Sequence, residues 1–179
     1  GKYDIIISGT YSTVENTQAV IKDFPNQKFI HYDANIQATK DNANNSFANA
    51  YSMSYLQNEG SYLVGFIASK ATKTGVIAEL GGGQIDVIYD FMYGFLEGAK
   101  YGKSDIKVVS SFIGDWENIN KAKDLAKDAM SKKADVLFHI AGGAGQGMFE
   151  ACAEKGDVWG IGVDADQWSE YNDAKKTDI

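Results

Sequence analysis

The 179-residue sequence contains no arginine, so all 17 basic residues are lysines, and these stand against 24 acidic residues for a formal net charge of -7. Nucleic-acid binding depends on a basic surface, and base-specific recognition depends largely on the bidentate guanidinium group. A polybasic face for anionic membranes is disfavoured for the same reason. The composition therefore argues against a nucleic-acid partner and against adhesion to a membrane surface.

Cysteine and histidine are also scarce, with Cys152, His31 and His139 as their only representatives. A single thiol can form neither an internal disulfide nor a CxxC pair, and the two histidines show no zinc-ligand spacing. Cys152 lies between two alanines in a helical stretch and the histidines lie inside strand-like runs, so we expect structural roles for all three. We predict no metal site, no cofactor and, because nucleophile-elbow and phosphate-loop motifs are also missing, no enzymatic activity.

No run approaches the roughly 18 apolar residues of a membrane-spanning helix, while a hydrophobic content of 44% is that of a globular protein. We therefore expect a folded segment that does not itself insert into a membrane. The sequence starts at Gly1, directly before a strand-like run. We expect it to be an interior piece of a longer protein.

Strand-like and helix-like segments alternate along the chain. Continuous β-branched runs predict buried strands, alternation predicts the strand at residues 49–55, and apolar residues at helical spacing predict helices. Strands are predicted at residues 3–8, 28–32, 49–55, 73–80, 106–111, 134–140 and 158–163, and helices from Ser12 to just before Pro25 and at 59–72, 85–101, 118–132 and 147–155. The polar residues 35–49 predict a surface excursion. This alternation, joined by short glycine-bearing loops, predicts an α/β fold with parallel sheets flanked by helices on both faces.

Details of three helices can also be predicted. Ser12 and Glu15 form a capping-box pattern at the start of the first helix. Leu63, Phe66 and Ile67 are spaced to form the buried face of the helix at 59–72. In the helix at 85–101 the buried stripe is predicted to contain Ile88, Met92, Phe95 and Ala99.

The candidate ligand site lies at the strand ends of the second half. Ligands of open α/β sheets bind outside the carboxyl ends of the strands, and these ends carry Gly81 to Gly83, Trp116, Gly142 to Gly147 and Asp164. Glycines let a backbone approach a ligand closely, and Trp116 offers an aromatic plane. A carboxylate such as that of Asp164 can accept two hydrogen bonds from a sugar diol. The combination suits a nucleoside or a sugar.

Simpler roles exist for the same residues. The glycines can be tight-turn residues, Trp116 can pack at a helix start, Asp164 can cap the next turn, and Phe138, on a strand, can be a core side chain. A Rossmann-type enzyme domain is the alternative function, because GGAGQG at residues 142–147 stands at a strand-to-helix turn with an acid at the end of the next strand. Its glycine spacing is GxGxG, however, and not GxGxxG.

Four ordered motifs resemble the basic membrane protein family, the substrate-binding lipoproteins of bacterial ABC importers that are related to purine nucleoside receptors. The motifs are NEGSYLVGFIASKATKTGVIAELGGG at 58–83, FMYGFLEGAKYG at 91–102, ADVLFHIAGGAGQGMFEACAEKG at 134–156 and IGVDADQ at 161–167. Together they cover much of the chain at consistent separation. Such a combination is far more specific than any one motif.

The resemblance implies a type I periplasmic-binding-protein architecture, in which two α/β lobes hold a ligand in the cleft between them. It places residues 1–57 in the later part of the first lobe, 58–165 in the second lobe, and 166–179 in a crossover that returns to the first. It also implies a nucleoside ligand, an ABC permease as partner, and a location at the extracellular face of the cell membrane. The lipid anchor would belong to the full-length protein and lie outside this sequence.

The resemblance also assigns site residues. Phe138 corresponds to the aromatic side chain that stacks on the purine, and stacking of this kind is worth roughly 1 to 3 kcal/mol. Gly142 and Gly143 belong to the loop whose backbone meets the ligand, and Asp164 to the carboxylate that binds ribose hydroxyls. Trp116 at the cleft edge and Asp33 from the first lobe are weaker assignments.

Overall fold

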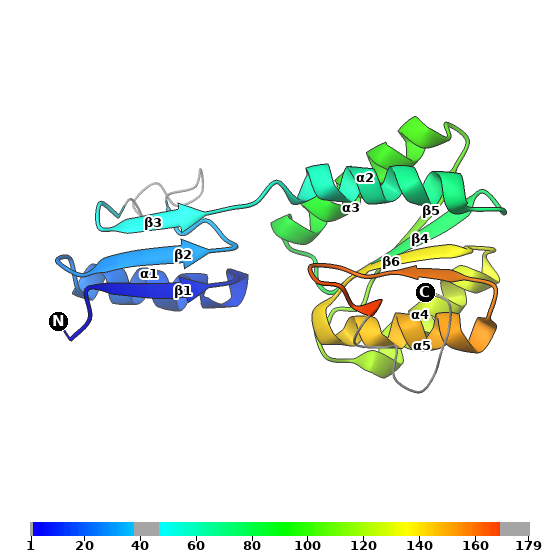
Figure 1. Ribbon diagram of the computed structural model, residues 1–179. Helices are drawn as coiled ribbons and strands as arrows, with labels where there is room; N and C mark the ends of the chain where they lie inside the picture. The colour runs from blue at the N-terminus through cyan, green and yellow to red at the C-terminus, as the bar shows by residue number, and fades with distance from the viewer. Residues whose placement is uncertain (1, 38–46, 169–179) are drawn as a thin grey trace. The chain divides into compact units, whose positions relative to one another are not determined.

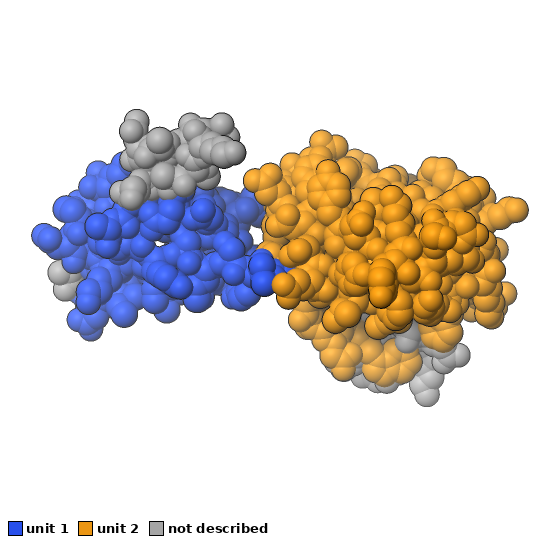
Figure 2. Space-filling model, turned by 90° about the horizontal axis from the view of Figure 1, so that it is seen from above, with its two compact units in different colours: residues 1–56 blue, residues 57–179 orange. Residues whose placement is uncertain are grey.

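The computed structural model describes residues 2–37 and 47–168 and divides into two compact units, Gly1–Leu56 and Gln57–Ile179 (Figures 1 and 2). Each unit contains a parallel sheet with helical cover. The α/β class predicted from the alternating segments is therefore confirmed. Residues 38–46, which belong to the predicted surface excursion, lie outside the described residues.

Unit 1 is a three-stranded parallel sheet in the order β1-β2-β3, with β1 at Ile5–Gly9, β2 at Lys28–Tyr32 and β3 at Ala50–Met53. A 3-10 turn, Tyr11–Thr13, leads from β1 into helix α1, Val14–Asp23. The buried cluster contains Ile21, Phe29, Ile36 and Phe47. Ile36 and Phe47 thus anchor the two ends of the polar stretch in the core, although its composition predicted a surface excursion.

The predicted capping box at Ser12 is wrong. The N-cap of α1 is Thr13, and the Ser12 hydroxyl instead lies 2.9 Å from the Thr10 hydroxyl within the 3-10 turn. Thr13 Oγ1 donates to the carbonyl of Gly9. The turn delays the start of the helix by about one residue because its hydrogen bonds use the hydroxyls that would otherwise cap it.

Only one face of this sheet is covered by a helix within residues 2–37 and 47–56. Phe29 lies on the α1 side, whereas the strand register places Ile7, Ile30 and Tyr51 together on the opposite side. Ile7 and Tyr51 are each 66% exposed. The prediction of helices on both faces therefore does not hold for the described part of unit 1.

Unit 2 has a four-stranded parallel sheet in the order β5-β4-β6-β7. Its strands are β4 (Val76–Gly81), β5 (Lys107–Phe112), β6 (Val136–Ile140) and β7 (Trp159–Ile161), and its helices are α2 (Gln57–Ala71), α3 (Asp86–Gly102), α4 (Ile119–Ser131) and α5 (Gln146–Lys155). Helices α2 and α3 cover one face and α4 and α5 the other (Figure 1). The chain runs outward from β4 to β5 and then returns past β4 to β6, so the topological switch point lies between β4 and β6.

The predicted buried faces of α2 and α3 had different outcomes. The predicted stripe of α3 is confirmed, with Ile88, Met92, Phe95 and Ala99 all buried. The predicted face of α2 is wrong, because Leu63 and Ile67 are each 61% exposed.

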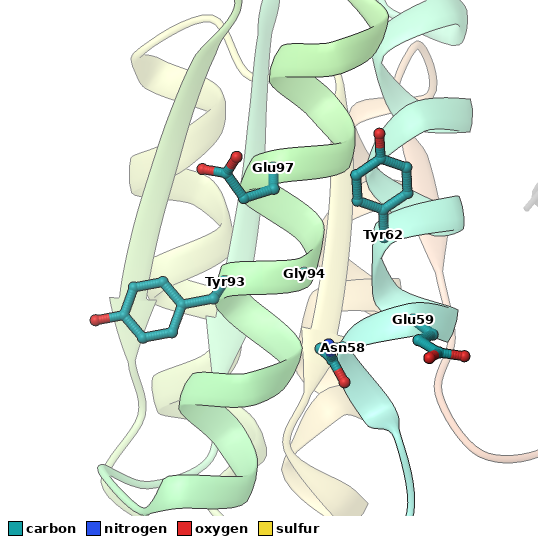
Figure 3. A pocket seen from close by; sticks show the side chains of 6 residues that line it. All are labelled: Asn58, Glu59, Tyr62, Tyr93, Gly94 and Glu97. Carbon is teal, nitrogen blue, oxygen red and sulfur yellow. The ribbon is translucent and has the colours of Figure 1, made fainter.

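The buried residues of α2 are instead small ones, namely Ser61, Gly65, Ala68 and Ser69. A Cβ atom at Gly98 of α3 would lie 1.9 Å from the Tyr62 carbonyl oxygen, and one at Gly94 would lie 2.3 Å from that of Asn58. Figure 3 shows this crossing from close by, with Gly94 on the side of α3 that faces α2. Two backbones this close leave no room for large side chains between them, which is why Leu63 and Ile67 point outward.

Candidate functional site

The carboxyl ends of β4, β5 and β6 are joined by backbone hydrogen bonds. Gly82 N–H donates to Ile140 O at 2.8 Å, and Asp115 N–H donates to Gly82 O at 3.0 Å. Ala144 N–H donates to Trp116 O at 2.8 Å. Three loops that are far apart in the sequence therefore form one surface at the switch point, which is where ligands of open α/β sheets bind.

Trp116 lies at the centre of this surface. A Cβ atom at Gly82 would lie 2.4 Å from its ring, and one at Gly142 would lie 3.8 Å from the ring. A Cβ atom at Gly143 would lie 3.5 Å from the Trp116 carbonyl oxygen. Trp116 is half-buried and packs against the core of unit 2, whereas Gly142 and Gly143 are exposed. The structure thus brings three of the predicted site residues together, and Trp116 also has the packing role considered as its alternative.

The glycine loop itself folds as a 3-10 turn, Gly142–Gly145, that leads directly into α5. Gly142 has a φ of 54°, a left-handed conformation that glycine adopts without strain. Because Ala144 N–H donates to Trp116 O, this amide is not directed at a phosphate group. A dinucleotide fold uses the loop amides for its pyrophosphate, so this contact argues against the Rossmann alternative.

Asp164 follows β7 and occupies a tight turn. Ala165 N–H donates to Val163 O at 2.8 Å across Asp164, whose φ is 66°. Three-residue turns with a positive central φ are rare and strained. The Asp164 side chain is exposed. In the turn that follows, Asp166 Oδ1 accepts a hydrogen bond from Trp168 N–H at 3.2 Å.

Phe138 is a core side chain in this structure. It is 2% exposed and stacks on Phe95 of α3, with ring centroids 5.4 Å apart and an interplanar angle of 27°. Its position on β6 directs it to the face covered by α3 rather than to the strand end. The assignment of Phe138 to purine stacking therefore needs correction, because this ring has its aromatic partner within the core.

In unit 1 the strand ends carry Asp33 and Thr10. Asp33 follows β2 with a φ of 62°. Thr10 follows β1 with φ 68° and ψ 154°, a region that is essentially restricted to glycine. For a β-branched residue this conformation is a clear outlier, and such strain concentrates at binding sites. Nothing in the run Gly9-Thr10-Tyr11 indicates a positive φ at the threonine, so the sequence does not predict this conformation.

The cysteine and both histidines are buried. Cys152 is buried, which raises the pKa of its thiol to about 12 and leaves it unreactive. His31 and His139 are each 0% exposed, and His31 Nδ1 lies 2.9 Å from the Ser8 hydroxyl. Within residues 2–37 and 47–168, no group of three or more histidine, cysteine and acidic side chains could hold a metal ion.

A shallow groove lies elsewhere on unit 2, over the crossing of α2 and α3. It encloses about 350 Å³ and is lined by Asn58, Glu59, Tyr62, Tyr93, Gly94 and Glu97 (Figure 3). The Tyr62 and Tyr93 rings come from different helices, and two exposed carboxylates lie on its rim. The groove contains none of the residues predicted from the sequence.

In the described part of the chain, no helix has the length and apolar character needed to cross a membrane.

Comparisons with known proteins place this geometry in a family. The model of the family described as ABC transporter substrate-binding protein PnrA-like matches residues 1–179. An ABC transporter nucleoside-binding protein, BmpA from Lactococcus lactis, is 38% identical over 172 residues, which are 92% of this chain and 47% of the relative. Basic membrane protein A from Borreliella afzelii is 40% identical over 121 residues, which are 67% of this chain and 37% of the relative. The chain therefore spans less than half of each of these relatives.

Solved structures share the fold. An ABC transporter solute-binding protein from Aeropyrum pernix superimposes with a TM-score of 0.80 at 25% identity, covering 94% of this chain and 48% of the other. A periplasmic solute-binding protein from Actinobacillus succinogenes, solved with bound D-allose, has a TM-score of 0.69 at 21% identity over 90% of this chain and 59% of the other. The fold is that of type I periplasmic-binding proteins, as the sequence resemblance implied. The chain belongs to the basic membrane protein family, the PnrA-like substrate-binding proteins of ABC transporters.

Proposed function

We propose that this chain is part of the extracytoplasmic solute-binding component of a bacterial ABC importer and that the complete protein binds a purine nucleoside or a related small ligand. Unit 1 then belongs to the first lobe and residues 58–165 to the second, with residues 166–179 crossing back. The protein acts by binding and release, not by catalysis. Its partners are the ligand and an ABC permease, and a lipid anchor holds the complete protein at the outer face of the membrane.

One observation supports the ligand class above all others. An exposed carboxylate, Asp164, stands on a strained turn at the end of β7, next to the strand that leads into the exposed glycines 142 and 143. A carboxylate can accept hydrogen bonds from two vicinal hydroxyls, while glycines without side chains admit a flat ring close to the backbone. This arrangement suits a ribose and its base better than a purely ionic ligand.

Each proposed site residue has a distinct role. Asp164 binds the ribose hydroxyls, and Gly142 and Gly143 contact the base or sugar through their backbone. Trp116 holds the glycine loop through its carbonyl and supplies the aromatic surface of unit 2, in place of Phe138. Asp33 contributes from unit 1.

Asp164→Asn in the complete protein tests this proposal. Asparagine tolerates a positive φ, so the turn is retained while the charge is lost. We expect nucleoside affinity to fall by at least about tenfold, because a charge-assisted hydrogen bond is worth on the order of 1.5 to 3 kcal/mol. Calorimetric titration with guanosine, adenosine and inosine measures the effect.

The matched control is Asp157→Asn, which removes an exposed carboxylate at the opposite, amino-terminal end of β7. Its affinity should equal that of the parent protein. Unchanged binding by Asp164→Asn would remove Asp164 from the site. A complete protein that binds none of the three nucleosides would overturn the ligand class.

A further inference from the structure

The turn at Asp164 needs an external support. A strained backbone persists only where its surroundings over-determine it. The turn is closed by one short-range hydrogen bond, Ala165 N–H to Val163 O. The bond uses the carbonyl of Val163 but not its amide, so the Val163 N–H needs an acceptor from outside the turn.

Gln167 supplies that acceptor. Its side-chain Oε1 accepts the Val163 N–H at 2.8 Å, so the side chain closes a ring around the whole turn. The Gln167 side chain packs closely on the backbone before the turn, because a Cβ atom at Gly162 would lie 2.5 Å from Gln167 Oε1. The contact also settles the orientation of the amide, since the atom that faces Val163 N–H must be the oxygen.

The same oxygen lies 3.0 Å from Nε2 of His139, which is completely buried on β6. An oxygen acceptor requires a donor, so Nε2 of His139 must carry the ring proton. Burial lowers the pKa of His139 to about 4, and the ring is therefore neutral at pH 7 with Nδ1 unprotonated. Nδ1 has no hydrogen-bond partner among the described residues.

His139 also supports the glycine loop. A Cβ atom at Gly145 would lie 2.1 Å from His139 Nδ1, so the end of the loop packs directly on the imidazole ring. Phe149 of α5 contacts the ring edge to face, with centroids 5.1 Å apart. One buried ring thus touches the end of the glycine loop and, through Gln167, the turn that presents Asp164.

We propose that Gln167 and His139 are positioning residues that hold Asp164 and the glycine loop in their ligand-binding geometry. Neither side chain contacts the ligand. Gln167 holds the strained turn, and the neutral Nε2–H tautomer of His139 holds Gln167. This inference rests on the proposed nucleoside site, but its structural part can be tested separately.

The test compares Gln167→Met with Gln167→Glu in the complete protein. Methionine has a similar length but no acceptor oxygen, so we expect nucleoside affinity to fall by about tenfold. Glutamate retains an acceptor oxygen at the same position and should restore most of the affinity. Nitrogen-15 NMR of the His139 ring provides a second measurement, in which the parent shows the Nε2–H tautomer and Gln167→Met shows a mixture of both tautomers.

The matched control is Gln27→Met, the same substitution in the turn before β2, where the amide donates to Asp4 O. It should leave affinity and the His139 spectrum unchanged. Equal affinity losses in Gln167→Met and Gln167→Glu would overturn the positioning role, as would a parent spectrum with the proton on Nδ1. If the parent binds no nucleoside, the proposed function fails, while the His139 spectrum still decides whether the hydrogen-bond chain exists.

Discussion

Gly98→Ala is expected to destabilise unit 2 by about 2 to 3 kcal/mol, although alanine is the better helix former by about 1 kcal/mol. The added Cβ atom would lie 1.9 Å from the backbone oxygen of Tyr62. A backbone atom cannot rotate away as a side chain can, so α2 and α3 must separate along their crossing. Separation would also weaken the hydrogen bond from Ser61 Oγ to Phe91 O.

Gly60→Ala is the matched control, because the same substitution is made in α2 at a site where the new Cβ would meet no atom within 4 Å outside its own stretch of helix. It should raise stability by about 0.5 to 1 kcal/mol through helix propensity alone. All three tryptophans of the sequence lie within residues 57–179, so tryptophan fluorescence during urea unfolding reports on unit 2. Stabilisation by both substitutions would contradict the close backbone contact seen at Gly98.

Glu79→Gln is expected to reduce the pH dependence of the stability of unit 2. Glu79 lies on the central strand β4, is 2% exposed and accepts a hydrogen bond from Ser110 Oγ at 2.6 Å. Its Oε2 atom has no hydrogen-bond partner among the described residues. Burial raises the pKa of this carboxyl to about 7, and the Ser110 hydrogen bond opposes the shift only in part.

The direction of the pH effect follows from this pKa. Between about pH 4.5 and 7 the folded protein holds a proton on Glu79 that the unfolded chain has lost, so stability falls as the pH rises. The buried carboxylate that remains above pH 7 destabilises the fold. The free energy of unfolding of Glu79→Gln, taken relative to that of the parent, should therefore rise by about 2 to 3 kcal/mol from pH 5 to pH 8.

Urea unfolding of both proteins at a series of pH values measures this difference. His139 titrates in the opposite sense, because burial lowers its pKa to about 4, but its contribution is common to both proteins and cancels in the comparison. Glu97→Gln on the surface of α3 controls for the loss of one negative charge. A constant difference between Glu79→Gln and the parent from pH 5 to pH 8 would show that Glu79 is ionised throughout.

The order and type of the elements followed from local pattern. Continuous apolar runs, and alternation in residues 49–55, predicted every described strand to within a few residues. The buried stripe of α3 was predicted correctly because Ile88, Met92 and Phe95 face a sheet. The same rule failed for α2, because this helix packs mainly on another helix. Hydropathy alone cannot distinguish a large apolar residue that faces a core from one excluded by close backbone packing.

For the candidate site, strand ends marked by glycine were enough to predict that Trp116, Gly142 and Gly143 lie together, and the place of Asp164 beside them stays a prediction. Phe138 was misassigned, because its closeness in sequence to the glycine loop does not decide on which side of β6 its ring lies. The strained φ of Thr10 and the closure of the Asp164 turn by Gln167 were not predicted, since neither feature leaves a local pattern in the sequence.

The sequence by itself determined the family, the α/β class and the net negative charge without arginine, because composition, period and ordered motifs are properties of the linear chain. Only the tertiary structure decided which loops meet at the switch point, that Phe138 belongs to the core, and that His139 and Gln167 connect the glycine loop with Asp164. The loop contacts join Gly82, Trp116 and Ala144, and the hydrogen bond between His139 and Gln167 joins residues 28 positions apart. Their existence depends on strand order and packing, which no local stretch of sequence encodes.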